Sequence, residues 1–167
     1  MGGNSSRNIS TTRWITRSAI LLALTLAFQM IGLPQPVTGP AVNAMLILSA
    51  LLAGPASGVI IGCLTPIIAW QRGILPPPLG PMIPFIALGN AVLVILFALL
   101  RKRHPVLGVA AGAVAKFAIL AAAVQLVVSV PPPIAAAMGF PQLITALAGG
   151  AIALLAYRVL KGVIETQ

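Results

Sequence analysis

Acidic residues are almost absent from this chain of 167 residues. Glu165 is the only one, whereas lysine and arginine together number ten, which gives a formal net charge of +9 at pH 7. The chain therefore lacks the pair of carboxylates that acid–base catalysis commonly uses. The one histidine, His104, follows three cations and lies outside the apolar runs. Since no carboxylate or histidine lies within those runs to relay protons, the composition argues against a proton-coupled carrier.

Cysteine and the common catalytic motifs are equally scarce. Cys63 is the only cysteine, which excludes a disulfide or a cysteine-rich metal site within one chain. The sequence contains neither the HExxH pattern of zinc hydrolases nor the GxxxxGKS/T loop that cradles nucleotide phosphates. We therefore predict a protein that is not an enzyme and carries no metal or cofactor. Only a bound solute or a partner can supply its driving force.

Charged residues make up 7% of the chain, and hydrophobic residues make up 59%. A soluble domain normally carries about 25% charged residues, so we predict an integral membrane protein. The basic residues flank the apolar runs, and membrane topology explains them better than nucleic-acid binding does.

Six apolar runs are separated by clusters of proline, glycine or cations. A spanning helix needs roughly 20 mainly apolar residues, and one run is kinked or tilted by Pro66. The sequence predicts an all-α membrane protein, a bundle of six transmembrane helices over about residues 17–160. It forms a single membrane domain over 1–167, with 1–16 as a polar N-terminal segment. The runs are 18–33, 37–53, 56–70, 82–100, 106–130 and about 134–157.

The cations predict the orientation of this bundle. Cytoplasmic loops carry an excess of lysine and arginine. With six spans and an internal N-terminus, eight of the ten cations fall on the cytoplasmic side, so both termini are predicted to be cytoplasmic. Those cations are Arg7, Arg13, Arg17, Arg101, Lys102, Arg103, Arg158 and Lys161.

Lys116 lies in the middle of the run 106–130, where no acidic residue is available to pair with it. Intramembrane ionisable residues usually face a cavity, a partner or a pathway. A protein carbonyl, water or a ligand bearing a carbonyl or a negative charge must therefore satisfy its ammonium. Ligand contact is the preferred interpretation. The alternative is a lysine whose long stem reaches the interface from a misjudged helix end.

Five amide side chains lie toward the outer half of the same bundle. A pocket open to the exterior requires polar side chains at this depth. We predict that these five amides bind solute together with Lys116. The alternative for each amide is an interhelical hydrogen bond that holds the bundle together. The five are Gln29, Asn43, Asn90, Gln125 and Gln142.

The segments 32–40 and 71–81 are rich in proline and fall on the outer side of the predicted topology. We predict that they cover the pocket, with Trp70 and Arg72 at its rim as further solute-binding residues. Trp70 has an alternative interpretation as an interfacial belt residue. Residues 71–81 fit a lid and a passive linker equally well.

Ala19, Ala23 and Ala27 are four residues apart and share one helix face, which allows another helix to approach closely. In a six-helix protein of this size, this pattern resembles the AxxxA signature of substrate-binding S components of energy-coupling factor (ECF) vitamin transporters. Other stretches resemble helices 2–5 of that superfamily. They are "GPAVNAMLILSALLAGPASGVIIGCLTP" (39–66), "PFIALGNAVLV" (84–94) and "AKFAIL" (115–120).

The resemblance implies a multi-pass protein of a prokaryotic cell membrane that captures a vitamin or cofactor precursor from outside. It also implies docking through the alanine face onto a transmembrane T subunit with two ABC ATPases, and toppling of the bundle to release solute. Whether that ATPase module is dedicated or shared stays open. A stand-alone carrier or channel, or an assembly subunit of a membrane complex, remains the alternative.

The substrate signatures of the biotin and thiamine members are missing from this sequence. Since no acidic residue is available, a cation such as thiamine is poorly served. A neutral, carbonyl-rich or anionic compound is favoured.

Overall fold

The computed structural model describes the backbone of residues 5–165 and the side chains of residues 11–161. Within these residues the chain is helical and contains no strand. The predicted N-terminal segment 1–16 lies partly outside this range, as does the side chain of Arg7. The elements are α1 (Ser5–Met30), α2 (Gln35–Leu52), α3 (Pro55–Gln71), η1 (Pro77–Met82), α4 (Ile83–Leu100), α5 (Pro105–Leu126), α6 (Pro132–Ala137) and α7 (Phe140–Glu165).

Proline and glycine set the helix boundaries. Five helices, α2 to α6, carry proline in one of their first two positions, where the missing N–H has no intrahelical partner to lose. Gly54, between α2 and α3, has a φ of +97°, a conformation that side chains with a Cβ rarely adopt. The chain therefore reverses sharply at Gly54, and α2 and α3 become neighbours.

The described residues contain seven α-helices, so the six predicted spans do not correspond one to one with the α-helices. The sixth predicted helix is divided into α6 and α7, which are separated by Met138 and Gly139. The fifth ends at Leu126 instead of residue 130, ahead of three consecutive prolines. A residue that precedes proline is disfavoured in the helical region. The predicted linker 71–81 also contains most of the 3-10 helix η1.

Four helical segments are long and apolar enough to cross a membrane. They are Gln35–Leu52, Pro77–Leu100, Pro105–Leu126 and Pro132–Lys161. The helix α3 is apolar but has only 17 residues. The apolar part of α1 starts at Ser18, and the helix ends at Met30. The chain is thus a multi-pass, all-α membrane protein, with four of the expected spans identified by length and hydropathy.

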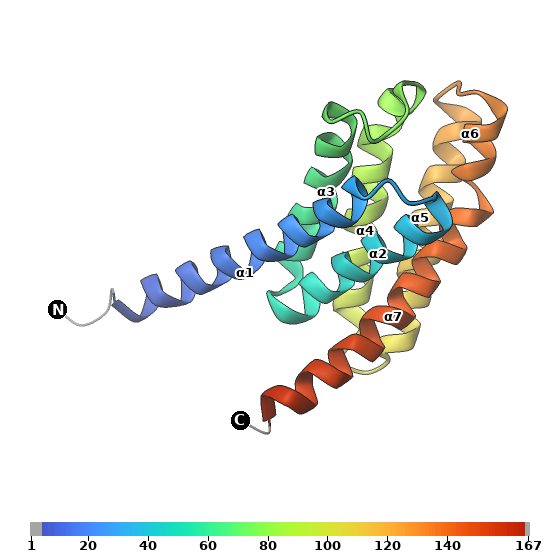
Figure 1. The fold of residues 1–167 in the computed structure, drawn as a ribbon. Helices are drawn as coiled ribbons and strands as arrows, with labels where there is room; N and C mark the ends of the chain where they lie inside the picture. The colour runs from blue at the N-terminus through green and yellow to red at the C-terminus, as the bar shows by residue number, and fades with distance from the viewer. Residues whose placement is uncertain (1–4, 166–167) are drawn as a thin grey trace.

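The core lies where α2, α3, α4, α5 and α7 meet. Its largest fully buried side chains include Phe97, Leu46 and Ile47. The helices approach closely at glycines: a Cβ on Gly112 of α5 would lie 2.7 Å from the carbonyl oxygen of Leu93 in α4. The helix α1 packs against α2 and α3, and its N-terminal part extends away from the other helices (Figure 1).

The two ends of the bundle differ in construction. The α4–α5 connection and the C-terminus of α7 lie at one end. The connection between α3 and η1 lies at the other end, together with α6 (Figure 1). At the first end, Arg101 Nη1 donates to the carbonyl oxygen of Ala50 in the last turn of α2, at 2.9 Å. The opposite end holds the cavity described next.

Candidate functional site

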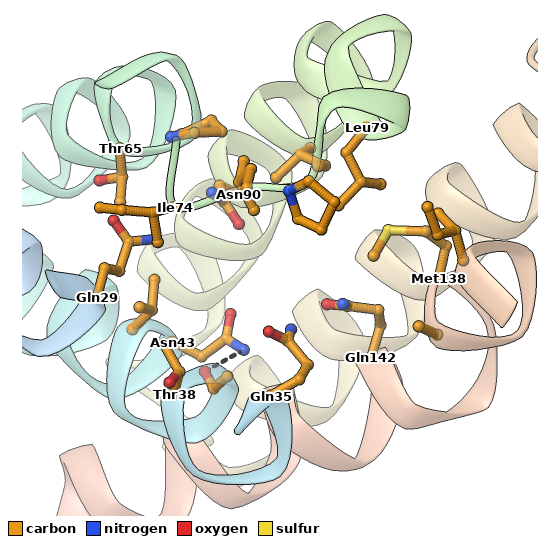
Figure 2. A pocket seen from close by; sticks show the side chains of 18 of the residues that line it. Gln29, Gln35, Thr38, Asn43, Thr65, Ile74, Leu79, Asn90, Met138 and Gln142 are labelled. Carbon is orange, nitrogen blue, oxygen red and sulfur yellow. Dashed lines mark hydrogen bonds between the residues drawn. The ribbon is translucent and has the colours of Figure 1, made fainter. Parts of the chain in front are cut away.

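A cavity of about 430 Å³ opens among the end of α1, the start of α2, the end of α3, the start of α4, η1 and α6. Most of its wall is apolar, and polar side chains project into it from several helices (Figure 2). The polar side chains that line it are those of Gln29, Gln35, Thr38, Asn43, Thr65, Asn90, Lys116 and Gln142.

Lys116 forms the centre of the buried polar cluster in this cavity. Its side chain is 4% exposed. Nζ donates to Asn43 Oδ1 at 2.7 Å and to Asn90 Oδ1 at 2.8 Å. The ammonium of α5 is thus bound by one amide from α2 and one from α4. These short contacts are in the range of hydrogen bonds with an ionised donor.

Backbone carbonyls fix the orientation of both amides. Asn43 Nδ2 donates to the carbonyl oxygen of Gly39 at 2.9 Å, and Asn90 Nδ2 donates to that of Gly62 at 2.9 Å. Because each NH₂ group is engaged by a carbonyl, each amide oxygen is turned toward the ammonium of Lys116. The cluster is therefore organised before any solute arrives.

Three glycines allow the neighbouring helices to press against this cluster. A Cβ on Gly149 of α7 would lie 2.6 Å from Asn43 Cβ, and one on Gly62 would lie 3.0 Å from Asn90 Cβ. A Cβ on Gly89 would lie 3.1 Å from Lys116 Cγ. Real Cβ atoms rarely approach so closely. The backbone at each of these glycines therefore packs directly against one residue of the cluster.

The ammonium of Lys116 retains one unused donor and its charge. A lysine has three N–H donors, and the two asparagines accept two of them. No other described residue accepts from Nζ. The chain's only acid, Glu165, is in the last turn of α7, at the end of the bundle away from the cavity. The cavity can therefore offer a charged hydrogen bond to a solute.

Two glutamines offer amides that no described residue engages. Gln142 is 7% exposed, lines the cavity and makes no side-chain hydrogen bond to a described residue. Gln29 Oε1 is buried and likewise unpartnered. Figure 2 shows the two amides on opposite sides of the cavity, with Asn43 and Asn90 between them. A buried polar atom without a partner, such as Gln29 Oε1, costs free energy, whereas the amide of Gln142 lines the cavity and can pair with a polar solute.

The structure separates the predicted solute-binding residues into two groups. Lys116, Asn43, Asn90, Gln29 and Gln142 all line the cavity. The predicted residues that do not line it are exposed, namely Gln125, Trp70 and Arg72.

Trp70 lies beside the cavity wall instead of in it. It is 45% exposed, and a Cβ on Gly80 in η1 would lie 3.2 Å from its Nε1. Its ring thus packs behind η1, whose Leu79 lines the cavity. Parts of both predicted covering segments, 32–40 and 71–81, do line the cavity, including Leu33 and Leu75.

Sequence reasoning missed the contribution of α6 and of two threonines. Ile134 and Met138, in and directly after α6, line the cavity, as do Thr38 and Thr65. The run of prolines at 131–133 was the available signal, because it separates α5 from the next segment. Thr65 gave no signal in the sequence, because a threonine within a helix commonly donates its hydroxyl to the carbonyl four residues earlier. Thr65 donates to the carbonyl of Ile61 in this way.

The helix α1 has two contrasting faces. Ala19, Ala23 and Ala27 are exposed, whereas Leu21 and Thr25 are buried against the bundle. Large apolar side chains such as Leu24 and Phe28 are exposed beside the alanines. The alanine face is therefore accessible to a neighbouring helix. Among the described residues, no three His, Cys, Asp or Glu side chains gather into a possible metal site.

The family model described as "ECF transporter, substrate-specific component" matches residues 13–161. No curated protein and no solved structure matches the chain. The family match spans the elements that build the cavity and the exposed face of α1, and the chain belongs to the family of substrate-specific components of ECF transporters.

Proposed function

We propose that this substrate-specific component captures a vitamin or cofactor precursor in the cavity around Lys116 and delivers it across a prokaryotic cell membrane. The observation that carries this proposal is the preorganised cluster: Nζ of Lys116 on two fixed amides, with a donor and a charge left over. Such fixed polar groups on a mostly apolar wall are typical of small-molecule sites.

We further propose that the chain spans the membrane six times, with both termini in the cytoplasm. The span candidates, the shorter helix α3 and the apolar part of α1 supply the six segments. The exposed cations Lys102 and Arg103 lie in the α4–α5 connection, at the end opposite the cavity. Because cations favour the cytoplasmic side, the cavity would then face the exterior.

The partners in this proposal are a transmembrane T subunit and two ABC ATPases. The exposed face of Ala19, Ala23 and Ala27 supports it, because small residues let a second helix approach closely in a membrane. The cavity and this face are separate surfaces, so capture and docking can be lost independently.

Native mass spectrometry of the detergent-purified protein tests capture. We expect a small molecule to be retained by the wild type and to be much reduced in Lys116→Met. Arg101→Met is the matched control, since it removes one cation at the other end of the bundle. Wild-type retention in Lys116→Met, or no retained molecule in any variant, would contradict the proposal.

Co-purification with the T subunit and the ATPases tests docking. Ala23→Trp places a bulky ring in the middle of the alanine face and should abolish co-purification while the retained solute stays. Leu155→Trp, on an exposed position of α7, is the control and should co-purify normally. Normal co-purification of Ala23→Trp would show that partners bind elsewhere.

A further inference from the structure

The cavity's charge and lining restrict what it can bind. Lys116 is the only basic residue among the described residues that line it, and none of them is acidic. Its two protein partners are neutral amides, so its positive charge is not neutralised by the described part of the chain. A charge in a poorly solvated site strongly favours an opposite charge beside it. One cation matches a monoanion, whereas a dianionic phosphate would be left with an uncompensated charge.

The unpartnered amides restrict the polar groups of the solute. Gln142 is more than nine-tenths buried, and its amide is without a partner in the described residues. Each primary amide carries both donors and an acceptor. An amide or hydroxyl group on the solute can pair with both kinds of atom, whereas a hydrocarbon would leave them unsatisfied.

The remaining wall restricts the body of the solute. Leu79, Ile86, Ile134 and Met138 supply aliphatic surface. No described residue that lines the cavity has an aromatic ring, so a flat ring would find no stacking partner there. Aromatic pairs add about 0.5–1.5 kcal/mol beyond burial of area, and this site does not offer that gain.

From these three restrictions we infer that the solute is a saturated aliphatic monocarboxylate that carries an amide or hydroxyl group. Its carboxylate accepts the free N–H of Lys116, and its amide or hydroxyl meets Gln142. Its chain lies on the aliphatic wall. This inference rests on the proposed function, because it takes the cavity to be the solute site.

Three probes that differ in one feature each can test this class. They are 6-acetamidohexanoate, its neutral counterpart 6-acetamidohexanamide, and 4-acetamidobenzoate, in which a flat ring replaces the chain. Binding is measured by isothermal titration or, for weak binding, by saturation-transfer NMR. We expect 6-acetamidohexanoate to bind about ten- to hundredfold more tightly than the neutral amide, because the amide can still accept from Lys116 but does not neutralise its charge. The aromatic acid should also bind more weakly.

Two variants assign these preferences to residues. Lys116→Met should remove the advantage of 6-acetamidohexanoate over the neutral amide. Gln142→Leu should weaken 6-acetamidohexanoate about two- to tenfold, the effect of one neutral hydrogen bond, and should leave plain hexanoate unaffected. Because the amide of Gln142 has no described partner, its loss should not unfold the protein, and the melting temperature serves as the check.

The inferred class is wrong if the neutral or the aromatic probe binds as tightly as 6-acetamidohexanoate, or if none of the three binds. The proposed function is judged separately, by whether the purified protein retains a solute in a manner that depends on Lys116. A retained aromatic or cationic molecule would leave capture intact and overturn only the class. A retained aliphatic monocarboxylate would support both.

Discussion

Arg101, at the end of the bundle opposite the cavity, and Lys116, beside the cavity, donate hydrogen bonds to different kinds of group. Arg101 is half-buried and donates to the carbonyl of Ala50, one of the last carbonyls of α2, which have no intrahelical partner. Lys116 is buried and donates to two side chains that no helix end requires. Arg101 satisfies a carbonyl at the end of a helix, whereas Lys116 holds two amide side chains in place at the cavity. This difference supports the proposal that the solute binds at the cavity end.

The largest expected effect comes from adding one methyl group behind the cluster. In Gly149→Ala the new Cβ would lie 2.6 Å from Asn43 Cβ and from the carbonyl oxygen of Pro40. Since backbone must move, we expect a loss of about 3 kcal/mol, at the upper end for overpacking. We expect the displaced Asn43 to weaken solute binding as well. Thermal unfolding and binding of the retained solute are measured together.

Gly58→Ala is the matched control near the start of α3, away from the cavity. Its Cβ would lie 2.9 Å from the carbonyl oxygen of Leu46, so it should also be destabilising. Its folded fraction should bind solute normally. If both variants bound solute equally well, or lost binding equally, the contrast between the ends would fail.

The next effect in size is coupling within the cluster. Lys116→Met leaves the Oδ1 atoms of Asn43 and Asn90 without their donor, and Asn90→Leu removes one of those acceptors. In a double-mutant cycle, Asn90→Leu should therefore cost about 1–2 kcal/mol less in the Lys116→Met background than in the wild type. Unfolding in a mild detergent supplies the four free energies. Additive costs would mean that the hydrogen bond to Asn90 contributes nothing.

The sequence predicted that Asn43, Asn90 and Lys116 lie close together. Each interrupts an apolar run, and its depth in the membrane could be estimated from its position in that run. Gln125 does not line the cavity because of its helical phase. It is nine residues after Lys116 on the same helix, and nine steps of 100° place it on the opposite face.

Tertiary packing decided what the sequence left open. Trp70 directly precedes the segment 71–81, part of which lines the cavity. Its ring, however, packs against Gly80 and does not enter the cavity. The short helix α6 has too few residues for a periodic pattern, and its place in the wall depends on where α5 ends. The exposure of the alanine face likewise required knowing which side of α1 meets α2 and α3.

A smaller effect is expected at the end opposite the cavity. Arg101→Met removes the bond to the carbonyl of Ala50, and we expect a loss of about 1 kcal/mol, the usual net value of one hydrogen bond. Lys102→Met, at the exposed neighbouring position, should be neutral. Chemical denaturation of both variants measures the difference. Equal stabilities would indicate that Arg101 does not hold α2.

The smallest effect concerns the segment 71–81. In a Trp14→Phe background Trp70 is the only tryptophan, and its ring packs against Gly80 next to the lining residue Leu79. Saturating amounts of the retained solute should therefore shift Trp70 emission slightly. The reverse variant, Trp70→Phe, reports from Trp14 and should show no shift. An unchanged Trp70 spectrum would make this segment a passive linker.

The most direct test compares the affinity of the retained solute, once it is identified, for Lys116→Met and Arg101→Met. Isothermal titration should give a dissociation constant about ten- to hundredfold higher for Lys116→Met than for the wild type, because one charged hydrogen bond is lost. Arg101→Met should bind as the wild type does. Wild-type affinity in Lys116→Met, or equal weakening in both variants, would contradict the assignment of solute capture to Lys116.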